Sequence, residues 1–227
     1  MIDNKFEKAP EYHQPEFWTI ENREQIYNLG REIVLNAPQL YIDVDVEADG
    51  IAGFGSMLAL GAQSPTGESF YSELKPTTEL HVPRQREFCE THNLQRERLH
   101  NEAPEASRVM VDFQKWVKGL EDKYHKTPVL TAFGPDFDAS FVKLYSAQAG
   151  IYDDYPFALL PFDLKSLALP LSKNWDWSKT SKNNLPEIII PEGDFTHHAL
   201  EDAQYQQKLH FGMAALLGSK IYLSKIM

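Results

Sequence analysis

The chain has 227 residues with 42% hydrophobic, 12% aromatic and 24% charged side chains, which suits one globular domain with additions and argues against a disordered chain. Its formal net charge of -11 argues against a protein that coats nucleic acid with a broad basic face, because such binding relies on Lys and Arg at phosphates. The charge still allows a nucleic-acid enzyme whose bound cations neutralise acidic ligands. A single cysteine, Cys89, excludes an intramolecular disulfide and a cysteine-rich zinc site.

The N-terminal region begins as a polar arm interrupted by prolines. Ile26, Leu29 and Ile33 then recur at helical spacing, which predicts a helix broken at Pro38. We assign residues 1–37 to an N-terminal arm and helix, a candidate contact for a protein partner or for a homodimer. The start has no apolar signal-peptide core, and no run of about 18 apolar residues occurs anywhere. We therefore expect a soluble, cytoplasmic protein that binds no membrane.

Three strand-like segments follow this helix, at residues 39–47, 55–63 and 68–76. Short apolar or alternating runs separated by Gly- and Pro-containing turns predict a meander of antiparallel strands. Residues 77–106 are polar and indicate a long connection with helical pieces. Because Arg and Glu alternate there, we expect this connection to present a solvated face.

The second half of the chain alternates helices with short apolar segments. The predicted elements are an amphipathic helix over 105–124, a buried strand over 129–134, a helix over 138–150, a helix from about 161 that passes into a Lys-, Trp- and Asn-rich loop, and a long helix over 196–218. Gly150 and Gly218 end two of these helices. We assign residues 38–218 to one domain and 219–227 to a C-terminal tail. The order of elements predicts a mixed α/β sheet covered by helices.

The segment "LYIDVDVEADG" carries four acids: Asp43, Asp45, Glu47 and Asp49. One interpretation takes Asp43 as nucleophile and Asp45 as acid/base of a phosphatase similar to the haloacid dehalogenase superfamily, although no later strand ends in the acidic pair that this family needs. The other takes Asp45 and Glu47 as a metal-binding pair. Side chains alternate along a strand, so these two share one face about 7 Å apart, and paired carboxylates suit hard cations.

Further acids occur in two specific settings. Asp138 stands at the start of a helix after a buried strand, three residues before Phe141. Asp202 lies five residues after His197 at the start of the last helix. This spacing can bring an imidazole near a water held by a metal that Asp202 binds.

Three motifs together resemble the DEDD superfamily of 3′-5′ exonucleases, subgroup DEDDh, which includes polymerase proofreading subunits, ribonuclease T and TREX-type enzymes. The motifs are Asp45-x-Glu47 with Gly50, Phe137-Asp138-x-x-Phe141, and His197-x-Ala199-Leu200-x-Asp202-Ala203. The resemblance spans residues 38–217, with the elements in the family's order. One departure is Phe133-Gly134, where the family commonly has His-Asn, so that a polar contact must be missing or supplied elsewhere.

The resemblance implies an RNase H-like fold, in which three antiparallel meander strands and then parallel strands form a five-stranded mixed sheet flanked by helices. It also implies two Mg²⁺ or Mn²⁺ ions per active site, held by Asp45, Glu47, Asp138 and Asp202, with His197 as general base. The expected reaction releases nucleoside 5′-monophosphates from the 3′ ends of single-stranded DNA or RNA, with DNA slightly favoured.

Substrate contacts are expected from two regions. Gly50, Ile51 and Phe54 follow the first motif and could pack against the terminal nucleotide. In "SKNWDWSKTSKNN", Lys173, Trp175 and Trp177 combine charge with aromatic rings, as single-strand binding requires. The alternative for this loop is that its tryptophans tuck under the fold.

Several residues keep an alternative interpretation. Asp43 is either an acid behind the metal ligands or a solvated strand residue, Asp49 is a loop residue, and His210 is a packing residue. At the level of function, the alternatives to the exonuclease are the phosphatase that uses Asp43 and Asp45, and a catalytically silent scaffold on the nuclease fold. The complete set of four acids and His197 argues against the scaffold.

Overall fold

The computed structural model describes residues 17–172, 175–181, 184–193 and 195–226, with side chains up to residue 219. Its helices and strands are α1 Arg23–Asn36, β1 Gln39–Ala48, β2 Met57–Gln63, β3 Ser69–Glu73, α2 Pro83–Thr91, α3 Arg96–Glu102, α4 Ala106–Tyr124, β4 Thr127–Ala132, α5 Asp136–Gln148, β5 Phe162–Asp163, α6 Leu164–Ala168 and α7 Ala199–Ile226. Short 3-10 turns occupy Ile20–Asn22, Tyr152–Asp154, Leu169–Leu171, Trp177–Lys179 and Glu187–Ile189. Within these described residues, no helix is both long and apolar enough to cross a membrane.

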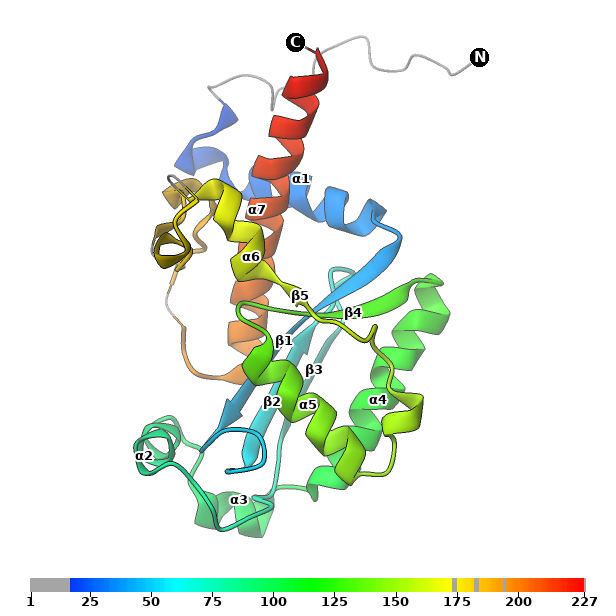
Figure 1. The fold of residues 1–227 in the computed structure, drawn as a ribbon, viewed down its shortest axis with the longest axis vertical. Coiled ribbons are helices and arrows are strands. Elements are labelled where there is room, and N and C mark those ends of the chain that lie inside the picture. The colour runs from blue at the N-terminus through cyan, green and yellow to red at the C-terminus, as the bar shows by residue number, and fades with distance from the viewer. Residues whose placement is uncertain (1–16, 173–174, 182–183, 194, 227) are drawn as a thin grey trace.

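The sheet has five strands in the order β3-β2-β1-β4-β5. β1 pairs with β2, and β2 with β3, in antiparallel fashion, whereas β4 and β5 continue the sheet in parallel from β1. The predicted architecture of a meander followed by parallel strands is confirmed. As the central strand, β1 brings its carboxyl end next to segments that are far apart in the sequence (Figure 1).

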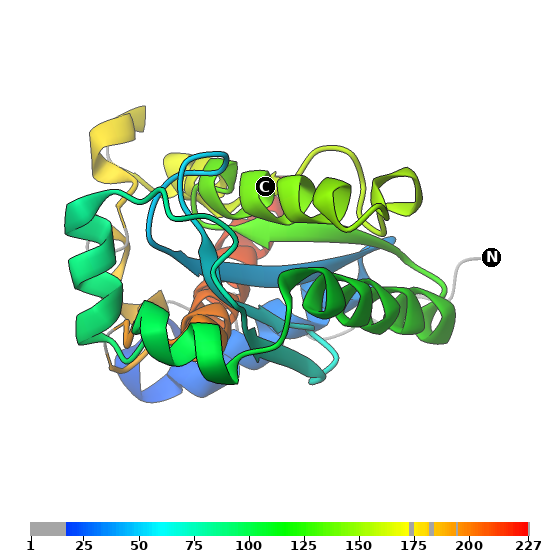
Figure 2. The ribbon, with the colours of Figure 1, turned by 90° about the horizontal axis from the view of Figure 1, so that it is seen from below.

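The two faces of β1 have different partners. Its even-numbered residues, such as Ile42, Val44 and Val46, are buried in one apolar cluster with α4 and α5. Its odd-numbered residues face α7, which crosses β1 and β2 on the other side of the sheet. Figure 2 shows α5 and α7 on opposite sides of β1. Because side chains alternate along a strand, the acids of β1 point toward α7.

The N-terminal helix and the last helix pack together, which changes two predictions. α1 exists, ends before Pro38 and buries Ile26, but Ile33 lies at the edge of its packed face and is 39% exposed. The last helix was expected to end at Gly218 and instead continues to Ile226. A Cβ at Gly218 would lie 2.7 Å from Cδ1 of Ile33, so this glycine serves the close approach of α1 to α7 and is no helix stop. Residues 1–16 of the predicted arm lie outside the described residues.

The connection between β3 and α4 is more buried than its charge pattern predicts. Arg96, at the start of α3, is buried against Asp49, and its guanidinium also donates to the Thr78 carbonyl. The Cys89 thiol of α2 donates to the carbonyl of Ala48 at 3.4 Å. These contacts fasten α2 and α3 beside the carboxyl end of β1. The prediction of a solvated face was therefore wrong at Arg96.

Candidate active site

The carboxyl end of β1 presents Asp45 and Glu47 on the face toward α7. Between them, the backbone N–H of Val46 donates to Oδ1 of Asp138 at 2.9 Å. Asp138 lies in the first turn of α5 and is 9% exposed, so this bond fixes the start of α5 against β1. The second motif is thereby joined to the first through the backbone of the strand.

His197 lies in the segment that leads into α7, and Asp202 lies in the first turn of this helix. Both Asp202 carboxylate oxygens accept backbone N–H groups, from Thr196 at 2.9 Å and from His197 at 3.1 Å. His197 therefore lies in the turn before α7, which begins at Ala199, and not on the helix as its spacing suggested. Its φ of 56° is a left-handed conformation that few non-glycine residues adopt. The carboxylate of Asp202 holds this strained turn in place.

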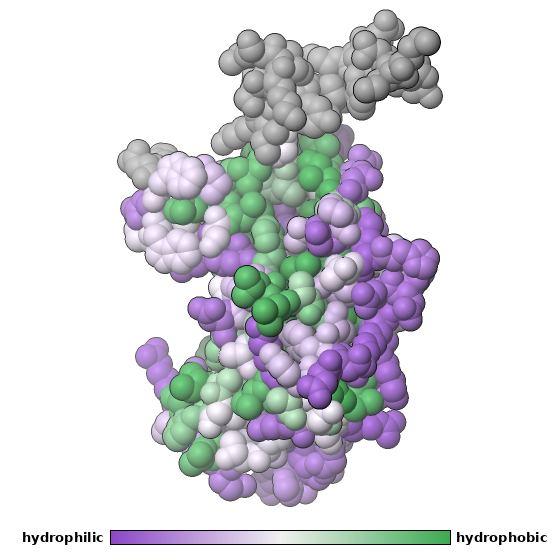
Figure 3. Space-filling view, turned by 45° about the vertical axis from the view of Figure 1, so that its right-hand side comes forward, coloured by the Kyte–Doolittle hydropathy of each residue, from purple (hydrophilic) through white to green (hydrophobic). Residues whose placement is uncertain are grey.

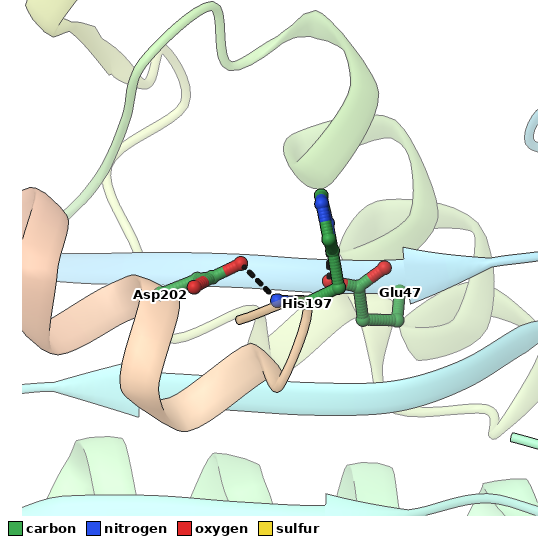
Figure 4. A group of neighbouring side chains, drawn as sticks. All are labelled: Glu47, His197 and Asp202. Carbon is green, nitrogen blue, oxygen red and sulfur yellow. Dashed lines mark hydrogen bonds and ion pairs between the residues drawn. The ribbon is translucent and has the colours of Figure 1, made fainter. Parts of the chain in front are cut away.

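These elements bring three side chains together. Potential ligand atoms of Glu47, His197 and Asp202 all lie within 4.8 Å of one another, and Nδ1 of His197 is 4.0 Å from Oε1 of Glu47. Figure 4 shows Asp202 at the start of α7 and His197 in the turn before it, with Glu47 beside His197. The approach depends on Gly61 of β2, because a Cβ there would lie 2.2 Å from the Ala199 carbonyl. Sequence-distant motifs thus form one cluster.

Electrostatic repulsion within this cluster makes it suitable for a cation. Burial, followed by the nearby charges of Asp202 and Asp138, raises the pKa of Glu47 to about 7. Carboxylates that repel one another gain most when a cation lies between them. The donors are mainly oxygens, which hard divalent cations prefer. The residues present therefore fit a divalent metal ion.

Asp43 belongs to the core beneath this cluster. It is 1% exposed, and its Oδ2 lies 3.5 Å from Nδ1 of His210. Burial raises the pKa of Asp43, and the neighbouring His210 acts in the opposite direction. The solvated interpretation of Asp43 was wrong, and a residue so enclosed cannot attack a substrate as a phosphatase nucleophile.

Asp49 is also a structural residue. It is fully buried, pairs with the Arg96 guanidinium and accepts the backbone N–H of Ser56 at 2.6 Å. These bonds close the turn between β1 and β2. Asp49 does lie in a loop, as predicted, but the sequence carried no sign of its structural role. Its carboxylate organises the turn that carries the predicted substrate contacts.

The turn itself holds three of these predicted contacts. Ile51 and Phe54 form a small antiparallel bridge, and their side chains are 58% and 44% exposed. A Cβ at Gly50 would lie 2.1 Å from the Phe54 carbonyl, so the turn's own backbone requires glycine. Contact of any of the three with a nucleotide stays a prediction.

The tryptophan-containing loop projects from the molecule. Trp175 is 69% exposed and Trp177 is 50% exposed, so neither is tucked under the fold. Nζ of Lys165 lies 4.7 Å from the centre of the Trp177 ring. Lys173 lies outside the described residues. Figure 3 shows the surface hollowed between the lobe formed by this part of the chain and the lobe that carries α2.

Two residues of α2 and its end were not predicted as part of the site. The rings of Phe88 and His92 lie 4.5 Å and 4.7 Å from that of His197, measured between ring centres, and 4.4 Å from each other. Phe88 is 41% exposed and forms a wall beside the imidazole. Only the fold could reveal this contact, because α2 and His197 are far apart in the sequence and no motif connects them.

Comparisons with solved structures identify the fold. The nuclease domain of 3′hExo, described as a DEDDh family member bound to rAMP, matches with a TM-score of 0.59 at 14% identity, over 77% of this chain and 91% of that one. The Mg²⁺- and Mn²⁺-bound form of Pop2p from S. pombe matches with a TM-score of 0.51 at 12% identity, over 85% and 88% of the two chains. The predicted RNase H-like exonuclease fold is confirmed.

Sequence comparison identifies the family. No family model matches the chain. The 3′-5′ DNA exonuclease Cap18 of Escherichia coli is 32% identical over 175 residues, which cover 75% of this chain and 89% of Cap18. The chain therefore belongs to the DEDD superfamily of 3′-5′ exonucleases and is an enzyme of the DEDDh type. The alternative assignment to a phosphatase is overturned.

Proposed function

We propose that this exonuclease removes nucleoside 5′-monophosphates from the 3′ end of single-stranded nucleic acid with the help of two Mg²⁺ or Mn²⁺ ions. The observation that carries the proposal is the convergence of Glu47, His197 and Asp202 at the end of β1, with their potential ligand atoms within 4.8 Å of one another. The raised pKa of Glu47 supports a bound cation, because its causes after burial itself are the nearby charges of Asp202 and Asp138. Pop2p, which shares the fold, has been solved in a form bound to both metals.

Four carboxylates would hold the ions: Asp45, Glu47, Asp138 and Asp202. Asp45 and Glu47 supply one strand face, while Asp138 and Asp202 approach from the starts of α5 and α7. Bound divalent cations would activate the attacking water and stabilise charge on the phosphate oxygens. The protein contributes rigid placement, since Asp138 is tied to Val46 and Asp202 to the turn at His197.

His197 is the proposed general base. Its side chain is 37% exposed, so one side of the imidazole can meet water while the other lies near Glu47. Imidazole exchanges protons near neutral pH, which suits removal of a proton from the attacking water. Phe88 and His92 limit where the ring can move.

Single-stranded DNA is the proposed preferred substrate. The name of Cap18 describes a DNA exonuclease, and the 3′hExo domain was bound to rAMP, so a DNA preference needs its own test. Exposed apolar side chains near the acids can pack against unpaired bases, and each stacked base contributes about 1–3 kcal/mol. The candidates with exposed side chains are Ile51, Phe54 and Phe88 near the acids, and Trp175 and Trp177 on the projecting loop. The backbone at Gly50 and the side chain of Lys173, which lies outside the described residues, are proposed from the sequence alone.

Oligonucleotides labelled at the 3′ or the 5′ end test the reaction. With Mg²⁺ we expect immediate release of labelled mononucleotide from the 3′ label and a ladder of shortened products from the 5′ label, with both lost in EDTA. Matched DNA and RNA strands compare the two sugars. Internal fragments, or activity that persists in EDTA, would contradict the proposal.

Variants separate the proposed roles. His197→Gln should slow hydrolysis by at least about 100-fold while Mn²⁺ binding is retained, because general bases contribute about 10²–10⁴-fold. Trp177→Ala should raise KM by about 5-fold or more with little change in kcat. Tyr152→Ala is the matched control for an exposed aromatic ring, since it lies beyond the far end of α5 from Asp138. Loss of Mn²⁺ binding in His197→Gln would mean that His197 is a ligand.

A further inference from the structure

A layer of buried polar side chains lies beneath the acids, between α7 and the sheet. Asp202, Gln206 and His210 follow one another at intervals of four residues, and each is at most 3% exposed. Residues four apart lie on the same face of a helix, so the three form a row that runs from the active site into the core. Buried polar groups in such a position require partners.

Gln206 finds partners on two strands. Its Nε2 lies 3.3 Å from the Thr131 carbonyl on β4, 3.4 Å from the Val44 carbonyl on β1 and 3.5 Å from Oδ1 of Asp43. Its Oε1 accepts the backbone N–H of Phe133 at 2.7 Å. The amide orientation is fixed because Nε2 faces three oxygen acceptors, whereas Oε1 faces a backbone N–H donor.

These contacts connect all three elements that carry the proposed metal ligands. On β1, Val44 directly precedes Asp45. Phe133 directly follows β4, and the chain then enters α5, which carries Asp138 in its first turn. On α7, Asp202 is one turn before Gln206. The Gln206 side chain therefore connects α7 to β1, to β4 and to the segment that leads into α5.

The segment that leads from β4 to α5 is held in the same way, because both backbone N–H groups of Phe133-Gly134 have side-chain partners. Gln206 accepts from Phe133, and Oδ1 of Asp163 accepts from Gly134 at 3.2 Å. Below Gln206, the contact between Asp43 and His210 continues the row into the core.

We propose that Gln206 is a positioning residue of the metal site, which holds α7 against β1 and β4 so that Asp202 stays beside Glu47 and Asp138. The inference rests on the proposed metal dependence of the exonuclease. Its physical basis is that carboxylates at close range repel one another, so that their spacing needs a restraint outside the ligands themselves. A buried amide with three acceptors and one donor supplies that restraint.

The test compares two buried glutamines. Gln206→Met keeps the length of the side chain and removes its hydrogen bonds. Gln114→Met is the control, because Gln114 of α4 is 9% exposed and donates to the carbonyls of Ile151 and Asp154, on the other face of the sheet from α7. Each variant is examined by thermal unfolding, by Mn²⁺ binding in an electron paramagnetic resonance titration without substrate, and by exonuclease kinetics.

We expect both variants to lower Tm, and only Gln206→Met to weaken Mn²⁺ binding and kcat, each by about 10-fold or more. Gln206→Glu keeps the acceptor for Phe133 but turns a carboxylate toward carbonyls, so its Mn²⁺ binding should fall at least as far. If either folded Gln206 variant binds Mn²⁺ with wild-type affinity, the inference is wrong. If the wild type binds Mn²⁺ but degrades no oligonucleotide, the proposed function fails, and the difference in Mn²⁺ binding still decides the role of Gln206.

Discussion

The four acids of the β1 region divide into two pairs with opposite surroundings. Asp43 and Asp49 are the more deeply buried pair, and each lies next to a basic side chain of the protein, His210 in one case and Arg96 in the other. Glu47 is less deeply buried, and although Nδ1 of His197 is 4.0 Å from its Oε1, its pKa is raised by burial and then by the nearby charges of Asp202 and Asp138. Asp45 shares the strand face of Glu47.

This difference explains why acids of one short segment have different roles. The Arg96 guanidinium compensates the carboxylate of Asp49 inside the protein, and the His210 imidazole opposes the rise that burial causes in the pKa of Asp43. A group of carboxylates that repel one another is costly unless a cation from solution enters it. The groups that the fold places around each acid, and not the spacing along the strand, separate the structural acids from the proposed ligands.

The largest effect is expected from Asp202→Asn, which removes one negative charge from the repelling group. Activity should fall by about 1000-fold or more, or about 4 kcal/mol of transition-state stabilisation. The fold should remain intact, because the amide oxygen still accepts one of the two backbone N–H groups that precede α7. Single-turnover kinetics and circular dichroism measure the two properties. Near-normal activity would show that Asp202 is no ligand.

Arg96→Met, which breaks the pair with Asp49, is expected to lower the free energy of unfolding by an amount comparable to the loss of transition-state stabilisation in Asp202→Asn. The change leaves Asp49 buried without its guanidinium, and breaking a buried pair in this way costs about 3–5 kcal/mol. Urea unfolding measures the loss, and Mn²⁺ binding to the folded protein should change little. Arg108→Met on the exposed face of α4 is the control, since its pair with Asp112 is solvated. Equal stability of the two variants would contradict the comparison.

A smaller effect is expected from pH in the metal-free protein. The pKa of Glu47 is raised from 4.5 to about 7, so the folded protein binds this proton more tightly than the unfolded chain does. The free energy of unfolding should therefore fall as pH rises from about 4.5 to about 7, by about 3 kcal/mol. Thermal unfolding in EDTA measures this slope. Glu47→Gln should flatten it, and a slope unchanged by that substitution would place its origin elsewhere.

The smallest effect is expected from Asp43→Asn. The amide keeps an acceptor for Gln206 and loses only the carboxylate oxygen that lies beside His210, so stability should fall by about 1–2 kcal/mol. Exonuclease activity should stay within about 3-fold of wild type, because Asp43 touches no proposed ligand or substrate site. Loss of activity in a stable Asp43→Asn variant would show that the structural pair also takes part in the reaction.

The sequence by itself determined the order and type of the main elements. Alternation over residues 39–47 predicted β1 with its acids on one face, and the recurrence of apolar residues over 105–124 predicted α4. The three motifs led to the exonuclease family because each one is a short pattern that a strand or a helix start presents directly. Local periodicity and local spacing carry this information, since both depend on backbone geometry alone.

Only the tertiary structure decided which neighbours these residues meet. Gly218 predicted a helix stop, yet α7 continues past it to Ile226, and this glycine lies against Ile33 of α1. Arg96, Phe88 and Gln206 carried no recognisable signal, because their partners lie far away in the chain. The sequence likewise contained no indication that Asp43 would lie beside His210 or that Asp49 would pair with Arg96. A charge is compensated by whatever the fold packs against it, and packing between distant segments leaves no fixed spacing in the sequence.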